Sequence, residues 1–273
     1  MPINSPKEIT DGYIAGAIGK ATMATWRLLV LSFFAGVLIS LGAIASSTAA
    51  MGVPDAGLTR LVTGAVFPIG LIMVVLLGTE LFTGNALMVS AVIARKITVL
   101  QLLRNWVLVY VGNFCGAVLM AWLMATFGQL DIGGGALAEY TAKVAAAKSA
   151  LPWGNAFVLG IFCNLMVCIA IYLGNTAHDT AGKIFGIFFP IFGFVVAGFE
   201  HCVANMYYIP AGIFAAMNPA YSAAIADAGI NVAVLNFPTF LAANLVPVTL
   251  GNIVGGVAVG LIMYAAHATK KRS

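Results

Sequence analysis

The stretch "GFEHCVANM" at residues 198–206 decides how this chain must fold. It follows directly on the apolar run "IFGIFFPIFGFVVA", yet it places Glu200 and His201 side by side. An acidic side chain at the centre of a membrane-spanning helix raises the free energy of insertion by about 2.5–3.5 kcal/mol. Ionisable groups at that depth usually mark a polar pathway or a paired site. We therefore expect a functional interruption of a membrane helix at this point.

The composition of the whole chain supports a membrane setting. The 273 residues are 62% hydrophobic and only 8% charged, whereas an average soluble domain is about 25% charged. The first 25 residues lack the apolar segment of a signal peptide, so we expect none to be cleaved. The net charge of +4 is small and scattered, and we expect no binding of nucleic acid. The composition predicts an all-α integral membrane protein.

Six apolar runs are long enough to span a bilayer, which takes about 20 residues of helix. They lie at 26–47, 60–79, 98–127, 152–173, 184–199 (continuing after a break to about 217) and 239–266. With both termini in the cytoplasm, the three external basic residues are Arg60, Lys143 and Lys148, and the other ten of the 13 are internal. This bias predicts an even number of spans and that orientation. All four cysteines, Cys115, Cys163, Cys168 and Cys202, fall in apolar runs, and we expect them to be buried thiols.

The chain divides into two halves that resemble each other. "GTELFTGNAL" at 78–87 aligns with "GFEHCVANMY" at 198–207, and "VYVGNFCGAVL" at 109–119 aligns with "PVTLGNIVGGVAV" at 247–259. Three spans in each half require the second half to be inserted upside down, which predicts an inverted repeat with a binding region near the midplane. The glycines of these motifs have the spacing that lets helices pack closely. We expect the following segments: an amphipathic N-terminal helix at 1–25 that begins with the capping box of Ser5 and Glu8, a first repeat at 26–127, an external linker at 128–151, a second repeat at 152–266 and a basic tail at 267–273.

Helices two and five are predicted to be broken. Gly78, Glu80 and Asn85 interrupt the second span, and Gly198, Glu200 and Asn205 interrupt the fifth. Irregular backbone at membrane depth must be buried in protein or line a wet cavity. A carboxylate can accept several hydrogen bonds, so we favour Glu80 and Glu200 as structural clamps of the two breaks. Direct handling of protons or cations by them is the alternative.

Three further polar residues are candidates for a pathway. His201 is the one histidine predicted at depth, and an imidazole can donate a hydrogen bond to an anion or pass a proton; the alternative is a core histidine. Asn164 lies in the middle of the fourth span, where it either lines a pore or joins helices by a hydrogen bond. Lys148 lies just outside that span, where it either attracts anions or is an ordinary surface lysine. No motif predicts a metal site or a bound cofactor.

Several of these motifs together resemble the formate/nitrite transporter family. They are "ELFTGN" at 80–85, "NW" at 105–106 with "VYVGNFCGA" at 109–117, "NLMVC" at 164–168, "GFEHCVANM" at 198–206 and "NLVPVTLGNIVGG" at 244–256. The resemblance implies a homopentamer of six-span, aquaporin-like protomers in the plasma membrane. It also implies a pore in each protomer for small monovalent anions such as formate, nitrite or hydrosulfide, and no enzymatic activity.

The resemblance also assigns residues to the pore. It implies a loop of Leu81, Phe82 and Thr83 in the second span, a central His201 followed by Asn205, a span-four Asn164 and an outer Lys148. It implies apolar constrictions formed by Phe67, Leu71, Leu81, Phe82, Val167 and Phe194. We expect formate to be the substrate, with proton coupling through His201, and we keep hydrosulfide and nitrite as alternatives. A haem-carrying subunit of an oxidoreductase is disfavoured, because haem ligation across spans would require a second deep ligand.

Overall fold

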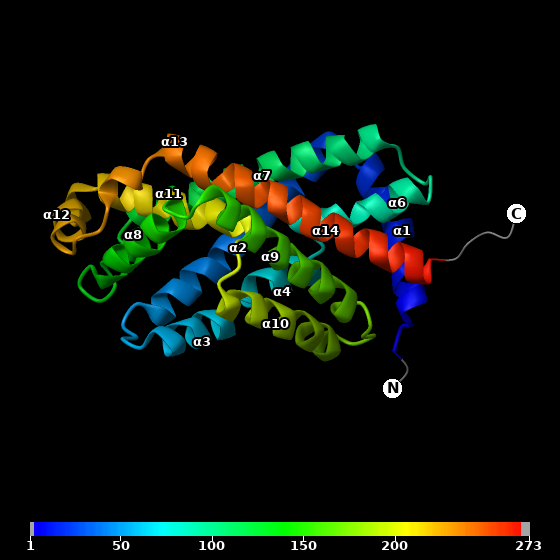
Figure 1. The fold of residues 1–273 in the computed structure, drawn as a ribbon, viewed down its shortest axis with the longest axis horizontal. Helices are drawn as coiled ribbons and strands as arrows, with labels where there is room; N and C mark the ends of the chain where they lie inside the picture. The colour runs from blue at the N-terminus through cyan, green and yellow to red at the C-terminus, as the bar shows by residue number, and fades with distance from the viewer. Residues whose placement is uncertain (1–2, 269–273) are drawn as a thin grey trace, which may run out of the picture.

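The computed structural model describes residues 3–268, and those residues contain helices and connecting loops but no strand. Six helical stretches are long and apolar enough to cross a membrane, and they lie side by side in one bundle (Figure 1). They are α2 (Thr25–Ala50), α3 with α4 (Ala56–Val66 and Ile69–Leu76), α7 (Val99–Thr126), α9 (Trp153–Gly174), α10 (Thr180–Ala197), and the last stretch, Phe237–His267, which comprises α13 (Phe237–Thr239), the π-helical turn η4 (Phe240–Leu245) and α14 (Val246–His267). The chain is therefore a multi-pass membrane protein with the expected number of spans.

Shorter helices complete the bundle. They are α1 (Pro6–Thr22), α5 (Phe82–Asn85), η1 (Ala86–Met88), α6 (Val89–Ile93), η2 (Gln129–Asp131), α8 (Ala136–Ser149), α11 (Cys202–Met217), α12 (Pro219–Asp227) and η3 (Val232–Val234). The helix α1 begins with the predicted capping box, in which Ser5 and Glu8 exchange hydrogen bonds. In Figure 1, α1 and α8 lie at opposite ends of the bundle. Part of the basic tail, residues 269–273, lies outside the described residues.

Both predicted breaks are present, and each begins at a glycine in the left-handed region. Gly78 has φ +64° and Gly198 has φ +75°. This conformation is unfavourable for a residue that carries a side chain, whereas glycine adopts it at almost no cost in free energy. The backbone then runs extended to Leu81 in the first half and to His201 in the second. The two breaks place extended, polar backbone in the middle of an otherwise helical bundle.

The observed breaks differ from the predicted ones in which residues they contain. Phe82 and Thr83 form the first turn of α5 instead of the loop, and Asn85 and Asn205 lie inside α5 and α11. The asparagines do not interrupt their spans because each side chain is held by neighbouring polar groups and its backbone continues the helix. A further turn, at Asn218–Pro219, bends α12 by 98° from α11.

Glycines bring the spanning helices into close contact. A Cβ placed on Gly116 of α7 would lie 2.1 Å from the carbonyl oxygen of Phe33 on α2, and one on Gly255 of α14 would lie 2.2 Å from that of Ile161 on α9. A methyl group cannot fit at either position without moving backbone. The predicted role of these small residues in helix packing is confirmed.

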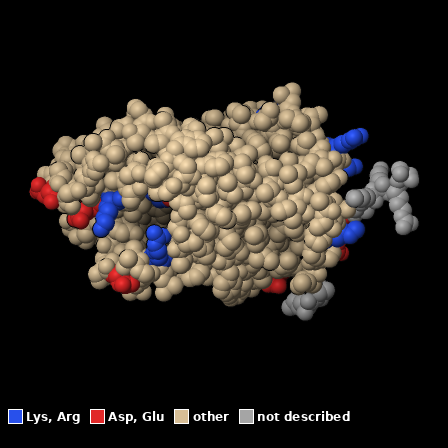
Figure 2. All heavy atoms as spheres, in the orientation of Figure 1, with Lys and Arg blue, Asp and Glu red and all other residues tan. Residues whose placement is uncertain are grey.

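The exposed charged residues on the face drawn in Figure 2 lie at the two ends of the bundle. Figure 2 shows lysine, arginine, aspartate and glutamate at either end of this face and a broad uncharged belt between them. The exposed fraction of Trp26 is 71% and that of Phe185 is 62%, as lipid contact requires. The expectation of four buried cysteines is wrong for Cys115, which is exposed on the outer face of α7. In a membrane protein a residue within an apolar run need not be buried inside the protein, because the helices also expose apolar side chains to lipid.

Candidate functional site

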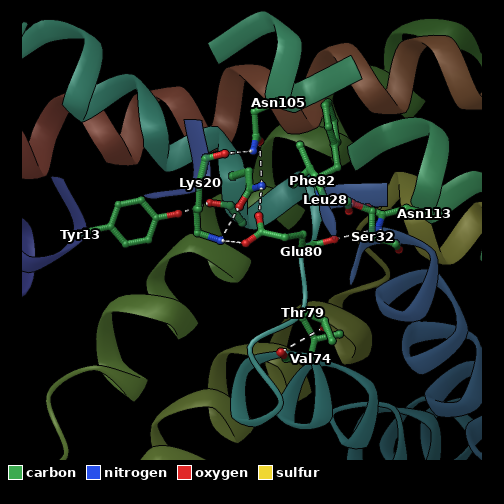
Figure 3. A network of polar contacts seen from close by, with 12 residues as sticks. Tyr13, Lys20, Leu28, Ser32, Val74, Thr79, Glu80, Phe82, Asn105 and Asn113 are labelled. Carbon is green, nitrogen blue, oxygen red and sulfur yellow. Dashed lines mark hydrogen bonds and ion pairs between the residues drawn. The ribbon is translucent and has the colours of Figure 1, made fainter. Parts of the chain in front are cut away.

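Asn113 of α7 holds the break of the first half. Its amide nitrogen donates to the carbonyl oxygens of Glu80 (2.9 Å) and Ser32 (2.7 Å), and its amide oxygen accepts from the N–H of Phe82 (2.9 Å). Glu80 belongs to the break, and Phe82 is the first residue of α5, the helix that follows it. Figure 3 shows Asn113 beside these two residues. By pairing the carbonyl oxygen of Glu80 and the N–H of Phe82, the buried asparagine removes the cost of leaving these two groups without partners.

Asn252 of α14 does the same for the second half. Its amide nitrogen donates to the carbonyl oxygens of Glu200 (2.9 Å) and Gly160 (2.8 Å), and its amide oxygen accepts from the N–H of Cys202 (2.9 Å). The sequence matched Asn113 with Asn252 but treated both as parts of glycine packing motifs. Their role in holding the breaks was missed, although their repeated position between two glycines was a usable signal.

The carboxylate of Glu80 lies in a buried network that includes helix α1. Lys20 of α1 is 2.7 Å from Oε1 of Glu80, and the amide nitrogen of Asn85 donates to Oε2 at 2.7 Å. The same amide also donates to the oxygen of Asn105 at 2.9 Å, and Asn105 donates in turn to the carbonyl oxygen of Lys20. Figure 3 shows Lys20 and Asn105 around Glu80, together with Tyr13, whose hydroxyl donates to the carbonyl oxygen of Gly84.

The carboxylate of Glu200 lies in a matching network that includes helix α8. Lys148 is 2.7 Å from Oε1 of Glu200, and the amide nitrogen of Asn205 donates to Oε2 at 2.6 Å. That amide also donates to the oxygen of Asn244 at 2.7 Å, and Asn244 donates to the carbonyl oxygen of Lys148. In both networks the glutamate binds lysine and asparagine side chains, whereas backbone N–H groups of the breaks go to other acceptors.

The two networks differ at one atom. The amide oxygen of Asn85 accepts a hydrogen bond from Lys20 at 3.1 Å, whereas the amide oxygen of Asn205 is buried without a hydrogen-bond partner among the described residues. Lys148 instead lies over the ring of Tyr208, with its Nζ 5.5 Å from the ring centroid. Lys148 is therefore held by one carboxylate and one aromatic ring, and 19% of its side chain is exposed.

His201 connects the two breaks. Its Nδ1 accepts a hydrogen bond from the N–H of Ala204 at 3.0 Å, and its Nε2 lies 3.0 Å from the hydroxyl oxygen of Thr83. Because Nδ1 is an acceptor, the ring proton of the neutral imidazole lies on Nε2 and is donated to Thr83. The threonine hydroxyl remains free to donate its own proton to a further group. The structure thus brings together two residues 118 positions apart in the sequence.

Asn164 supports this junction from α9. Its amide nitrogen donates to the carbonyl oxygens of Thr83 (3.1 Å) and Asn252 (2.6 Å), which joins the two halves. Among the six apolar residues expected at constrictions, Phe67 packs edge-on against Phe194 at 5.8 Å, and the ring of Phe194 lies 6.1 Å from that of His201. Each of the six is at most 4% exposed: Phe67, Leu71, Leu81, Phe82, Val167 and Phe194.

A cavity of about 780 Å³ opens from one end of the bundle toward His201. Its inner part is lined by His201, Asn205, Phe67 and Phe194, and Lys148 and Glu200 also face it. In Figure 2 a hollow flanked by basic side chains is visible at the end where α3 and α8 lie. Leu71, Leu81, Phe82 and Val167 do not line this cavity, and Thr83 does not line it either.

The sequence and the fold were compared with known proteins. A profile of the family described as formate/nitrite transporter matches residues 7–266. The formate channel FocA of Haemophilus influenzae is 39% identical, with 97% of this chain and 95% of that protein covered. A probable formate transporter of Methanothermobacter thermautotrophicus is 37% identical, with 95% of each chain covered.

Solved structures resemble the fold over nearly its whole length. A pentameric formate channel with formate bound has a TM-score of 0.79 and 34% sequence identity, covering 88% of this chain and 96% of that one. A structure described as an ion channel of the same family has a TM-score of 0.80 and 29% identity, covering 95% of this chain and 98% of that one. The match to the family profile over residues 7–266 and the identity to its members show that the chain belongs to the formate/nitrite transporter family.

Proposed function

We propose that this protein is a membrane channel for small monovalent anions of weak acids, with formate as the main substrate. The observation that carries the proposal is the cavity that leads from the end of the bundle to a buried polar junction, Thr83 with His201, between apolar side chains. Formate is favoured over nitrite and hydrosulfide because several relatives are described as formate channels or formate transporters.

The proposed unit is a homopentamer in the plasma membrane, with one pathway in each protomer. The pentameric neighbour supports this assembly, and the apolar belt of exposed side chains supplies surface for both lipid and neighbouring protomers. We propose that both termini face the cytoplasm, because ten of the 13 basic residues then lie inside. In this orientation the cavity opens to the outside of the cell.

The two halves are proposed to be an inverted repeat with the segment boundaries predicted from the sequence. The support is the pairing of hydrogen bonds: Asn113 and Asn252 hold equivalent groups, and Glu80 and Glu200 each bind one lysine and one asparagine five residues later. The first break is followed by α5, η1 and α6 and the second by α11, and α6 and α11 lie toward opposite ends of the bundle in Figure 1.

The proposed pathway passes the external Lys148, the Phe67–Phe194 narrowing and the junction of His201 with Thr83. It then passes Leu81, Phe82 and Val167 toward the cytoplasmic end, with Leu71 beside the first narrowing. Asn164 and Asn205 position groups along this route. A bare anion in an apolar slot would cost tens of kcal/mol by an idealised solvation argument, and a neutral weak acid far less. We propose that the substrate crosses the narrowings as the neutral acid.

We propose that His201 acts as a neutral hydrogen-bond donor and that water supplies the proton. Protonation of Nδ1 would place an N–H against the N–H of Ala204, so a second proton on the ring requires that hydrogen bond to break. Nε2–H together with the Thr83 hydroxyl can instead donate to a substrate oxygen. Proton coupling then follows from the acidity of the substrate. It is detected as a dependence of the uptake rate on the pH on the two sides of the membrane.

Stopped-flow uptake into proteoliposomes tests the proposed function. Formate, nitrite and hydrosulfide are supplied at a series of external pH values, with protein-free liposomes as the control. We expect formate to be taken up fastest, and its rate to rise as the external pH falls, because more neutral acid forms. Osmotic water flux with no anion uptake would identify a neutral channel and reject the proposal.

A further inference from the structure

Two basic residues of the cavity have no part in the pathway described above. Arg60 lies on α3 and Lys143 lies on α8, and both line the cavity that leads to His201. With Lys148, they are the three basic residues that the sequence placed outside the membrane. The fold brings all three to one cavity, although Arg60 lies 83 positions from Lys143 in the sequence.

The charge of the cavity comes mainly from these two residues. Its lining includes three cations, Arg60, Lys143 and Lys148, and one carboxylate, Glu200. The 2.7 Å ion pair of Lys148 with Glu200 leaves little net charge deep in the cavity. Two other acids lie on the same helices or at their ends, Asp55 and Glu139, but neither lines the cavity. Asp55 caps α3 by accepting the N–H of Leu58.

The side chain of Arg60 lies against the start of the second break. A Cβ placed on Gly198 would be 2.5 Å from its Nη1, so only a glycine leaves room for the guanidinium there. No hydrogen bond or ion pair from the guanidinium is present within residues 3–268. The guanidinium therefore lies at the cavity wall beside the segment that carries Glu200 and His201, and its planar set of N–H donors is suited to a carboxylate or another planar anion.

The exposure of the basic residues decreases along the cavity. Arg60 and Lys143 are exposed, Lys148 retains 19% exposure of its side chain, and His201 is 3% exposed. A cleft lined by charges of one sign raises the local concentration of the opposite ion and its rate of association by roughly 10-fold to 1,000-fold. Arg60 and Lys143 are placed to do this before an anion reaches Lys148.

We propose that Arg60 and Lys143 form an anion-capture site at the mouth of the cavity, which binds small monovalent carboxylates and inorganic anions and delivers them to the pathway. This inference rests on the proposed function, because it concerns the same substrate and the same cavity. It assigns the electrostatic attraction to the two unpaired cations at the mouth and leaves Lys148 as a paired residue deeper in the route.

The test is initial formate uptake into right-side-out membrane vesicles, with Arg60→Gln, Lys143→Gln and the double variant. Rates are measured against external formate at about 0.01 M and about 1 M ionic strength, where the screening length falls from about 30 Å to about 3 Å. We expect the double variant to have about a tenfold higher KM at low salt, with an unchanged maximal rate. At high salt its KM should equal that of the wild type.

Matched variants separate charge from structure. Arg60→Lys keeps the charge and should retain most of the low-salt affinity, and Lys96→Gln removes an exposed charge that does not line the cavity and should change nothing. A double variant with the wild-type KM at low salt, or a loss that persists at 1 M salt, would overturn the capture site while leaving the channel function intact. A wild type that takes up no formate would instead remove the proposed function, and the capture site with it.

Discussion

The hydroxyl oxygen of Thr83 lies 3.0 Å from Nε2 of His201, so each break supplies one half of a single buried junction. Thr83 is positioned in part by the opposite half of the chain, and His201 by its own half. The carbonyl oxygen of Thr83 accepts from Asn164 of the second half, and Nδ1 of His201 is fixed by the N–H of Ala204. The junction is therefore held on both sides before any substrate arrives.

Replacement of Thr83 by valine should impair the junction while keeping its shape. Valine has nearly the volume of threonine but no hydroxyl, so Nε2–H of His201 loses its acceptor and the substrate loses a donor. A net contribution of about 1–1.5 kcal/mol for such a hydrogen bond predicts roughly a tenfold slower formate flux. Thr83→Ser retains the hydroxyl and should retain most of the flux in proteoliposome uptake. Equal rates for the valine and serine variants would show that the hydroxyl has no role in transport.

The ion pair between Lys148 and Glu200 should behave as a coupled unit in stability. Lys148→Met leaves a carboxylate of 6% exposure without its cation, and the loss of one partner of a buried pair costs about 3 kcal/mol. Adding Glu200→Gln to that variant removes the unpaired charge, so the double variant should be more stable than Lys148→Met alone. Thermal unfolding of the purified oligomer in detergent measures this cycle. Additive losses would mean that the two charges do not interact.

Asn252 should be far more important to stability than an asparagine in a surface loop. Asn252→Ala leaves the N–H of Cys202 and the carbonyl oxygen of Glu200 without the partner that pairs them in the break, and we expect a loss of more than about 2 kcal/mol. Asn231→Ala removes one exposed hydrogen bond and serves as the matched control. The comparison is made by thermal unfolding and by the yield of folded oligomer. Similar losses for the two variants would contradict the role assigned to Asn252.

Gly116 tests the close packing of α2 against α7. Gly116→Ala places a methyl group against the backbone of Phe33, which cannot yield as a flexible side chain would. We expect the helix pair to be forced apart and the unfolding temperature to fall. The control is Gly16→Ala on α1, where a Cβ meets nothing within 4 Å and alanine favours the helix by up to about 1 kcal/mol. An unchanged unfolding temperature for Gly116→Ala would show that contact at this glycine does not set the distance between α2 and α7.

The sequence was sufficient to predict the spans, the two breaks and the capping box of α1. Each of these depends on local chemistry: runs of apolar residues, glycines that reach positive φ, and a serine three residues before a glutamate. The pairing of Gly78 with Gly198 and of Asn113 with Asn252 was also visible as a repeat. What a repeated residue does could not be derived, because it depends on which backbone groups the fold brings within reach.

The partners of the two glutamates illustrate this limit. Lys20 was predicted on the cytoplasmic side and Lys148 just outside the fourth span. The pairing of Lys20 with Glu80 depends on how α1 docks onto the bundle. Two regularities could have indicated the networks. Asn105 and Asn244 each lie eight residues before the asparagine that holds a break, and Lys20 and Lys148 each lie five residues before the start of the next spanning helix.

Formate uptake by His201→Phe, compared with wild type and with His178→Phe from the loop before α10, tests the central claim most directly. In the proposed pathway the substrate passes the Nε2–H of His201. We predict that His201→Phe takes up formate at least about tenfold more slowly, by the loss of a hydrogen-bond donor at the inner end of the cavity, and that His178→Phe matches the wild type. Wild-type formate uptake by His201→Phe, with an unchanged dependence on pH, would contradict it.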